Sequence, residues 1–175
     1  MRRGFLEWPA LQRWDFKFFK EKYGAIKTQA NLNCPADMHV PYDIDSANYV
    51  SQEITVREVI EMIENGDPNV THYISQQPVE KFPGLADDIN LDDVCCCPTD
   101  ERQAYVWIGG KNTRSGYHFD LVDNALLQVM GQKHVRLVAP SDAANMYPYA
   151  DFIHKSKVNA HYCIGETASS FTNSI

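Results

Sequence analysis

A histidine and an aspartate two residues apart, His118 and Asp120, lie in residues 117–121, a stretch whose pattern predicts a β-strand. Side chains alternate between the two faces of a strand, so residues i and i+2 project from the same face. An imidazole and a carboxylate placed side by side are two of the three ligands of a 2-His-1-carboxylate iron site. The spacing therefore favours a divalent metal site, although such a pair taken alone is also typical of a solvent-exposed surface.

A lysine, Lys133, interrupts the apolar pattern of residues 133–138, which we expect to form a hairpin with residues 125–130 around Gly131. A lysine on the apolar face of a strand requires an anionic partner. That partner is either a carboxylate of the protein or a small acid bound in the fold. The alternative for Lys133 is a side chain that extends to solvent.

This part of the chain resembles the JmjC/cupin-type iron(II)- and 2-oxoglutarate-dependent oxygenases, in the branch similar to asparaginyl hydroxylases. The matching motifs are N-T-x-S-G-x-H-x-D at residues 112–120, Asn124, G-x-K at residues 131–133 and P-S-D-x-x-N-x-Y-P at residues 140–148. Looser matches lie at residues 8–14, 20–24 and 73–85. The resemblance therefore extends to about residue 159.

The resemblance implies a role for each matching residue. His118 and Asp120 would bind Fe(II) and leave coordination positions open for 2-oxoglutarate and oxygen. Lys133 would hold the far carboxylate of 2-oxoglutarate, and Ser115 would donate a second hydrogen bond to it. Asn124 would form a hydrogen bond nearby, although as a single residue it is also typical of a turn.

Two further positions complete the implied site. Tyr73 matches a tyrosine near the co-substrate, and a buried structural tyrosine is an equal alternative. The family supplies its second histidine from a late W-x-H pattern, and no tryptophan follows Trp107. His161 is the candidate that remains, since His134 belongs to an outward strand face and His154 comes too early. We expect residues 160–175 to be an atypical, truncated tail that would leave the barrel incomplete.

The implied reaction is hydroxylation of a protein or peptide, with Fe(II) and 2-oxoglutarate as cofactors. Three alternatives stay open: a non-catalytic JmjC-like pseudoenzyme or binding module that lacks the distal histidine, a lysine demethylase, and a cupin of another reaction class such as an isomerase. A homodimer is left open as well.

Local patterns indicate a mainly β fold with N-terminal helices (α+β), arranged as a double-stranded β-helix, the jelly-roll or cupin-like barrel. We expect one domain over residues 1–175, with a helical part at 1–70, barrel strands at 71–159 and the tail at 160–175. Helices are expected at residues 16–23, after Asp15, and from the capping box Thr55-x-x-Glu58 to Gly66. Strands are expected near residues 25–29, 70–76 and 104–108, and a helical turn after Ser141.

Composition limits the partners. The formal net charge is −7, and basic residues cluster only near the N-terminus, which argues against a nucleic-acid surface. No apolar run approaches the roughly 20 residues of a membrane span. Five cysteines, three of them adjacent, predict free thiols in a reducing, intracellular compartment, cytoplasmic or nuclear. The acidic residues 78–98 are expected to form a solvated surface crossing.

Overall fold

The computed structural model describes residues 3–35, 50–158 and 170–171, which fall into two compact units. The first unit comprises the described residues up to Thr113, and the second begins at Arg114. The expectation of one domain over residues 1–175 stays a prediction.

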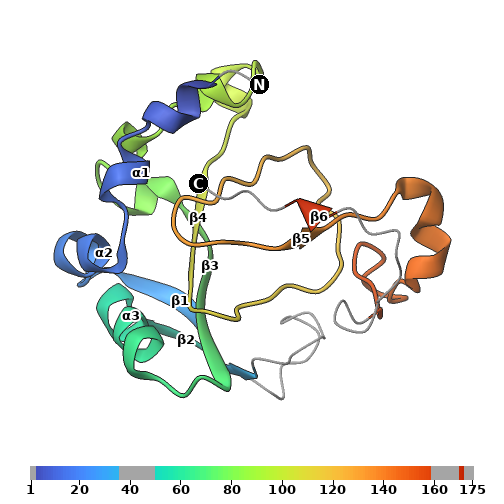
Figure 1. Cartoon of the computed structure of the whole chain (residues 1–175), viewed down its shortest axis with the longest axis horizontal. Coiled ribbons are helices and arrows are strands. Elements are labelled where there is room, and N and C mark those ends of the chain that lie inside the picture. The colour runs from blue at the N-terminus through green and yellow to red at the C-terminus, as the bar shows by residue number, and fades with distance from the viewer. Residues whose placement is uncertain (1–2, 36–49, 159–169, 172–175) are drawn as a thin grey trace. The chain divides into compact units, whose positions relative to one another are not determined.

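An open antiparallel sheet of four strands forms the centre of the first unit (Figure 1). The strands are β1 (Lys27–Pro35), β2 (Val50–Thr55), β3 (Val70–Pro78) and β4 (Tyr105–Gly109), in the order β2-β1-β3-β4. The expected strands at residues 70–76 and 104–108 are confirmed, and β1 extends well beyond the expected residues 25–29. An antiparallel sheet with few helices is therefore present, and the closed barrel is not seen in the described residues.

The two longer helices of this unit begin at side-chain caps. The helices are α1 (Ala10–Arg13), α2 (Phe16–Tyr23) and α3 (Val56–Asn65), preceded by a 3-10 helix at Arg3–Glu7. The Asp15 carboxylate accepts from the backbone N–H of Phe18 at 2.7 Å. At α3 the capping box is closed, because the Glu58 carboxylate accepts from the Thr55 backbone N–H at 3.0 Å and the Thr55 hydroxyl accepts from the Glu58 backbone N–H at 3.3 Å. Both predicted helices are confirmed.

The hydrophobic core lies where α2 and α3 meet the sheet. The ring of Phe82 meets those of Phe19 and Tyr23 edge to face, with centroids 6.1 and 5.4 Å apart. Such aromatic pairs add roughly 0.5–1.5 kcal/mol each beyond the burial of their surface. Ile60 and Ile74 are fully buried in the same cluster. Phe19 and Tyr23 of α2 and Ile60 of α3 therefore form the helical side of this core.

The crossing from β3 to β4 corrects our expectation of a solvated acidic surface. It contains four 3-10 helices, Val79–Lys81, Ala86–Asp88, Leu91–Asp93 and Thr99–Glu101. Asp88 is only 2% exposed and accepts from the Arg13 guanidinium at 2.5 Å and from the Trp14 indole N–H at 2.9 Å. The expectation is wrong for Asp88, because its burial is compensated by a charged and a neutral donor from the α1 region. The crossing therefore anchors the N-terminal segment.

The second unit has little regular structure in the part of it that is described. The two-residue strands β5 (Val135–Arg136) and β6 (Ser170–Phe171) pair with each other, and a 3-10 helix spans Pro140–Met146. The expected strand at residues 117–121 and the hairpin of residues 125–130 with 133–138 are wrong. A strand needs a partner for its backbone groups as well as an alternating pattern. The helical turn begins at Pro140, without a cap from Ser141.

Two remaining expectations concern cysteines and membranes. Cys95 and Cys97 are joined in a disulfide, which corrects the expectation of free thiols; their Cα atoms lie 5.5 Å apart, within bridging distance. Cys34 and Cys96 are free, and Cys163 lies outside the described residues. Among the described residues, no helix has both the length and the apolar character that crossing a membrane would require.

Candidate metal centre

The segment that carries His118 is held by backbone hydrogen bonds to residues 154–156. The N–H of Phe119 donates to the carbonyl of His154 at 2.9 Å, and the N–H of Ser156 donates to the carbonyl of Tyr117 at 2.9 Å. These bonds form an isolated antiparallel bridge between His118 and Lys155. The predicted ligands therefore lie on a bridged loop and not on a continuous strand.

The imidazole of His118 is oriented by the backbone. Its Nδ1 lies 2.8 Å from the carbonyl oxygen of Gly116. Since a carbonyl only accepts, Nδ1 carries the proton and the lone pair of Nε2 is left free. Histidines that bind metals typically donate their other ring N–H in this way. His118 thus has the tautomer of a metal ligand.

Asp120 presents one oxygen toward that nitrogen. Its Oδ1 lies 3.9 Å from Nε2 of His118, while its Oδ2 accepts a hydrogen bond from the amide of Asn124. Two ligand atoms on neighbouring positions of one octahedral ion, each about 2.1 Å from it, lie about 3.0 Å apart. The pair has to close by about 0.9 Å to bind an ion in that geometry, and Asn124 orients the carboxylate. Within the described ranges, no third His, Cys, Asp or Glu joins the pair as a potential ligand.

The other predicted residues have different positions. Lys133 lies two residues before β5, not within a strand, and no ion pair joins it to Asp120 in the described structure. Lys133 and Ser115 are exposed residues, yet partial withdrawal from water lowers the pKa of the Lys133 ammonium. Their roles toward 2-oxoglutarate, and that of His161, which lies outside the described residues, stay predictions.

Tyr73 belongs to β3 in the first unit. It is 7% exposed and lies opposite Gly109 of β4 in the sheet register. A Cβ added to Gly109 would come within 2.9 Å of the Tyr73 ring, so glycine is needed there for close packing. The structure thus agrees with the alternative of a buried structural tyrosine. A role of Tyr73 toward the co-substrate stays a prediction.

Arg114, four residues before His118 in the sequence, was missed by sequence reasoning. Arg114 occupies the variable position of the N-T-x-S motif, and its Nη1 is buried without a hydrogen-bond partner in the described structure. A buried guanidinium nitrogen without a partner is rare and favours an anionic ligand. The only signal in the sequence was an arginine directly before Ser115, and such a common feature does not identify a functional residue.

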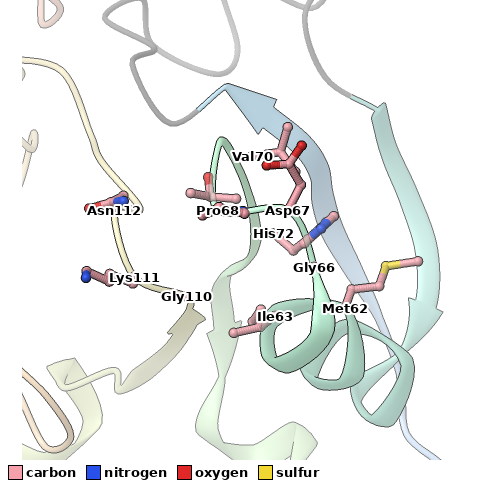
Figure 2. A pocket seen from close by; sticks show the side chains of 11 residues that line it. Met62, Ile63, Gly66, Asp67, Pro68, Val70, His72, Gly110, Lys111 and Asn112 are labelled. Atoms are coloured by element: carbon pink, nitrogen blue, oxygen red, sulfur yellow. The ribbon is translucent and has the colours of Figure 1, made fainter.

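A separate hollow lies in the first unit, beside the end of α3 (Figure 2). Its volume is about 230 Å³, and its lining includes Met62, Ile63 and His72. His72 is 6% exposed, and its Nδ1 accepts from the backbone N–H of Asn33 at 3.4 Å. Burial lowers the pKa of His72, which favours the neutral imidazole. None of the predicted site residues lines this hollow.

Comparison with known proteins relates the whole chain to one family. The family model described as a cupin-like domain matches residues 2–171. Jumonji C domain-containing protein 5 of Drosophila melanogaster is 28% identical over 157 residues, which cover 81% of this chain and 36% of that protein. Lysine-specific demethylase 8 of Danio rerio is 32% identical over 166 residues, which cover 81% of this chain and 41% of that protein. Lysine-specific demethylase 8 of Xenopus tropicalis is 27% identical over 146 residues, which cover 81% of this chain and 31% of that protein.

The chain thus spans 31–41% of the length of these relatives. Members of the JmjC group generally use Fe(II) and 2-oxoglutarate, which agrees with the ligand atoms that His118 and Asp120 present. The match over residues 2–171 covers nearly all of the chain, including both units. The chain belongs to the family of cupin-like domains, and its relatives are JmjC-domain proteins of the iron(II)- and 2-oxoglutarate-dependent oxygenase group.

Proposed function

We propose that this chain is the oxygenase domain of an Fe(II)- and 2-oxoglutarate-dependent protein hydroxylase. The observation that carries the proposal is the pair of free ligand atoms, Nε2 of His118 and Oδ1 of Asp120, 3.9 Å apart. Each residue is fixed through its other polar atom, by the Gly116 carbonyl and by Asn124. Such supporting hydrogen bonds are the usual environment of metal ligands.

The residues of the chain bind and orient in this proposal. His118 and Asp120 hold the metal, and His161 is our candidate for the third ligand. Lys133 pairs with the far carboxylate of 2-oxoglutarate, and Ser115 donates a second hydrogen bond to it. When bound, iron with 2-oxoglutarate supplies the oxidising power for hydroxylating an unactivated C–H bond, with loss of carbon dioxide and formation of succinate.

The fold and setting of the domain belong to the same proposal. The four-stranded antiparallel sheet supports its assignment as one sheet of a double-stranded β-helix, in which inward-facing residues surround the metal. The substrate is a protein or peptide, and the protein acts inside the cell. The family and the resemblance in sequence support both points.

Removal of a methyl group from lysine is the second candidate reaction. Its support is that relatives in Danio rerio and Xenopus tropicalis are named lysine-specific demethylase 8. A non-catalytic binding module is the third candidate, supported by the presence of only two candidate ligands in the described ranges. Two ligands hold a divalent ion less tightly than three.

Thermal unfolding with and without Mn(II) and 2-oxoglutarate tests the site directly, because Mn(II) occupies iron sites without redox chemistry. A ligand at one hundred times its Kd stabilises the folded state by about 2.7 kcal/mol, which corresponds to a rise in Tm of about 5–10 °C for a chain of this size. His118→Ala should abolish the rise, and His134→Ala, an exposed histidine of the same unit, should retain it. The absence of any rise in the wild-type protein would contradict the metal site.

The reaction type is tested separately with Fe(II) and peptide libraries. Hydroxylation adds one oxygen to the peptide mass, whereas demethylation removes a methyl group and releases formaldehyde. Succinate formation without a change in the peptide would support an oxygenase whose substrate is absent from the library. A metal-dependent rise in Tm without any succinate would favour the non-catalytic module.

A further inference from the structure

Three consecutive cysteines, Cys95, Cys96 and Cys97, lie on the crossing between β3 and β4 in the first unit. Cys95 and Cys97 form a disulfide, and Cys96 between them is free and exposed. The proposed metal ligands His118 and Asp120 belong to the other unit, and the proposed function uses none of the three cysteines. The cluster therefore calls for an explanation of its own.

The Cys95–Cys97 bridge is poorly suited to stabilise the fold. Only one residue separates the two cysteines, and the stabilisation from closing a loop decreases as the loop becomes shorter. The first unit is held instead by its sheet and by the core around Phe82. Opening the bridge should therefore leave the folded state intact, which a site of reversible chemistry requires.

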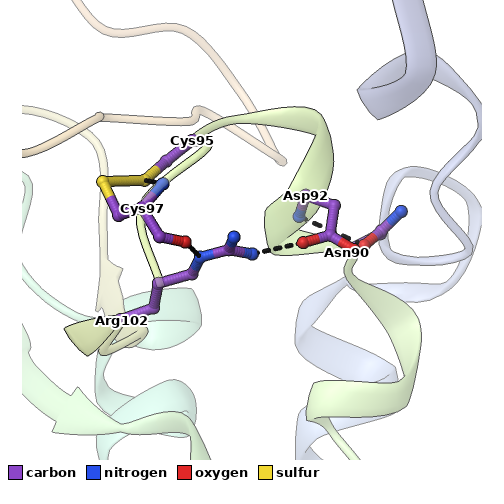
Figure 3. A network of polar contacts seen from close by, with 5 residues as sticks. All are labelled: Asn90, Asp92, Cys95, Cys97 and Arg102. Atoms are coloured by element: carbon purple, nitrogen blue, oxygen red, sulfur yellow. Dashed lines mark hydrogen bonds and ion pairs between the residues drawn. A yellow bond between two sulfur atoms is a disulfide. The ribbon is translucent and has the colours of Figure 1, made fainter. Parts of the chain in front are cut away.

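The two sulfur atoms have different surroundings. Cys97 is exposed, whereas Cys95 is half-buried. The backbone N–H of Cys97 donates to Sγ of Cys95 at 3.0 Å (Figure 3). An N–H donor stabilises a thiolate more strongly than a neutral sulfur atom. An incoming thiolate therefore reaches Sγ of Cys97 most easily, and Cys95 is the better leaving group.

Arg102 holds the backbone around the bridge. Its Nε donates to the carbonyl oxygen of Cys97 at 2.6 Å, and its guanidinium forms an ion pair with Asp92 (Figure 3). Asn90 accepts from the backbone N–H of Asp92 at 3.2 Å. None of these bonds involves a sulfur atom, so they persist when the bridge opens. The frame keeps Cys95 and Cys97 close enough for the bridge to form again.

We propose that the Cys95–Cys97 bridge is a thiol–disulfide exchange site for low-molecular-weight thiols of the glutathione class. The thiolate attacks Sγ of Cys97, so that a mixed disulfide forms, the Cys95–Cys97 bond breaks and its electron pair leaves on Cys95 as a thiolate. A second thiol then attacks the mixed disulfide and releases the oxidised small molecule and the Cys97 thiolate. Two thiols are thus oxidised to one disulfide while one protein disulfide is reduced.

Redox titration of the full chain tests this proposal. The protein is equilibrated in buffers of reduced and oxidised glutathione, quenched in acid, alkylated in denaturant without reductant and mapped by mass spectrometry. We expect Cys95 and Cys97 to be unlabelled in oxidising buffers and to become labelled together as the reduced fraction rises. Cys34 becomes labelled in every buffer and serves as the reference. Cys96→Ser should not change the titration.

Two results of the titration would overturn the proposal. Full labelling of Cys95 and Cys97 in every buffer would mean that no bridge forms, and no labelling in reduced glutathione would mean that the bridge does not exchange. Because this experiment uses the wild-type protein, its outcome does not depend on the folding of a variant.

The direction of attack is tested with two single variants whose folding is checked by circular dichroism. In Cys95→Ser, oxidised glutathione should convert Cys97 to a lasting mixed disulfide and release one reduced glutathione. In Cys97→Ser, the half-buried Cys95 should react about tenfold more slowly. Equal rates in the two variants would contradict the assignment of Cys97 as the sulfur that is attacked.

Discussion

The two units of this chain differ in how much of their apolar sequence pattern forms helices and strands. In the first, the strands pair over many residues and the helices bury one face against them. In the second, apolar residues are present in a comparable pattern, yet Leu121 is 80% and Val122 75% exposed. The difference teaches that an apolar pattern produces an element only where a partner strand or face is available. The candidate metal centre lies in the less regular unit.

Removing the ring of Phe82 should produce the largest effect, because Phe82 contacts both Phe19 and Tyr23 in the core of the first unit. Phe82→Ala should lower the free energy of unfolding by about 3–5 kcal/mol. Urea denaturation followed by fluorescence measures this loss. A change below about 1 kcal/mol would mean that this core does not carry the stability of the unit.

The buried carboxylate of Asp88 should give the next largest effect. Asp88→Ala leaves the Trp14 indole N–H and the Arg13 guanidinium without their acceptor, which should cost about 1.5–3 kcal/mol. Half of the Arg13 side chain is in contact with water, and this exposure limits the loss. Asp87→Ala is the matched control, since Asp87 is exposed, and its unfolding midpoint in urea should remain unchanged.

The capping box of α3 should contribute less. Thr55→Ala should destabilise the first unit by about 1 kcal/mol in thermal or urea unfolding. The hydrogen bonds from Thr55 lower the pKa of Glu58 below its ordinary value of 4.5, so the ionised carboxylate favours the folded state. This stability is present above pH 4.5 and is lost as pH falls through the lower pKa of the folded state. The Thr55→Ala variant should therefore lose less stability than the wild type as the pH falls below 4.5.

His72 should give a small effect that depends on pH. Burial lowers its pKa from the ordinary 6.5, so the unfolded chain binds a proton more readily than the folded one. The contribution of neutral His72 to stability is therefore complete above pH 6.5 and decreases as pH falls below that value. This contribution is measured by comparing the unfolding midpoints of the wild type and of His72→Gln at pH 7.5 and at pH 5.5. An equal change with pH in both proteins would exclude His72 as the cause.

The smallest effect is expected in the second unit, where apolar side chains are exposed. Leu121→Ser should change the free energy of unfolding by no more than about 0.5 kcal/mol, because Leu121 has little packing to lose. In the absence of metal, His118→Ala should likewise change the free energy of unfolding very little. A loss of several kcal/mol from Leu121→Ser would show that Leu121 is packed in solution. The second unit would then have a hydrophobic core, as the first unit does.

Much of the first unit could be predicted from the sequence. Asp15 and the Thr55–Glu58 capping box located both longer helices, because such hydrogen bonds form between residues a few positions apart. Asp88 could not be predicted as buried, because its partners Arg13 and Trp14 lie about 75 residues away along the chain. Acidic residues in a crossing are solvated unless such distant donors reach them.

The candidate site divides in the same way. The His-x-Asp spacing was enough to place His118 and Asp120 together, since residues two positions apart remain neighbours on either a strand or a bridged loop. Which of their atoms are free to bind metal depends on the fold, because the Gly116 carbonyl orients the imidazole and the Asn124 amide holds one carboxylate oxygen. The sequence likewise determined that three cysteines are adjacent, and folding decided that Cys95 and Cys97 are bridged, since the bend of the backbone sets the distance between their sulfur atoms.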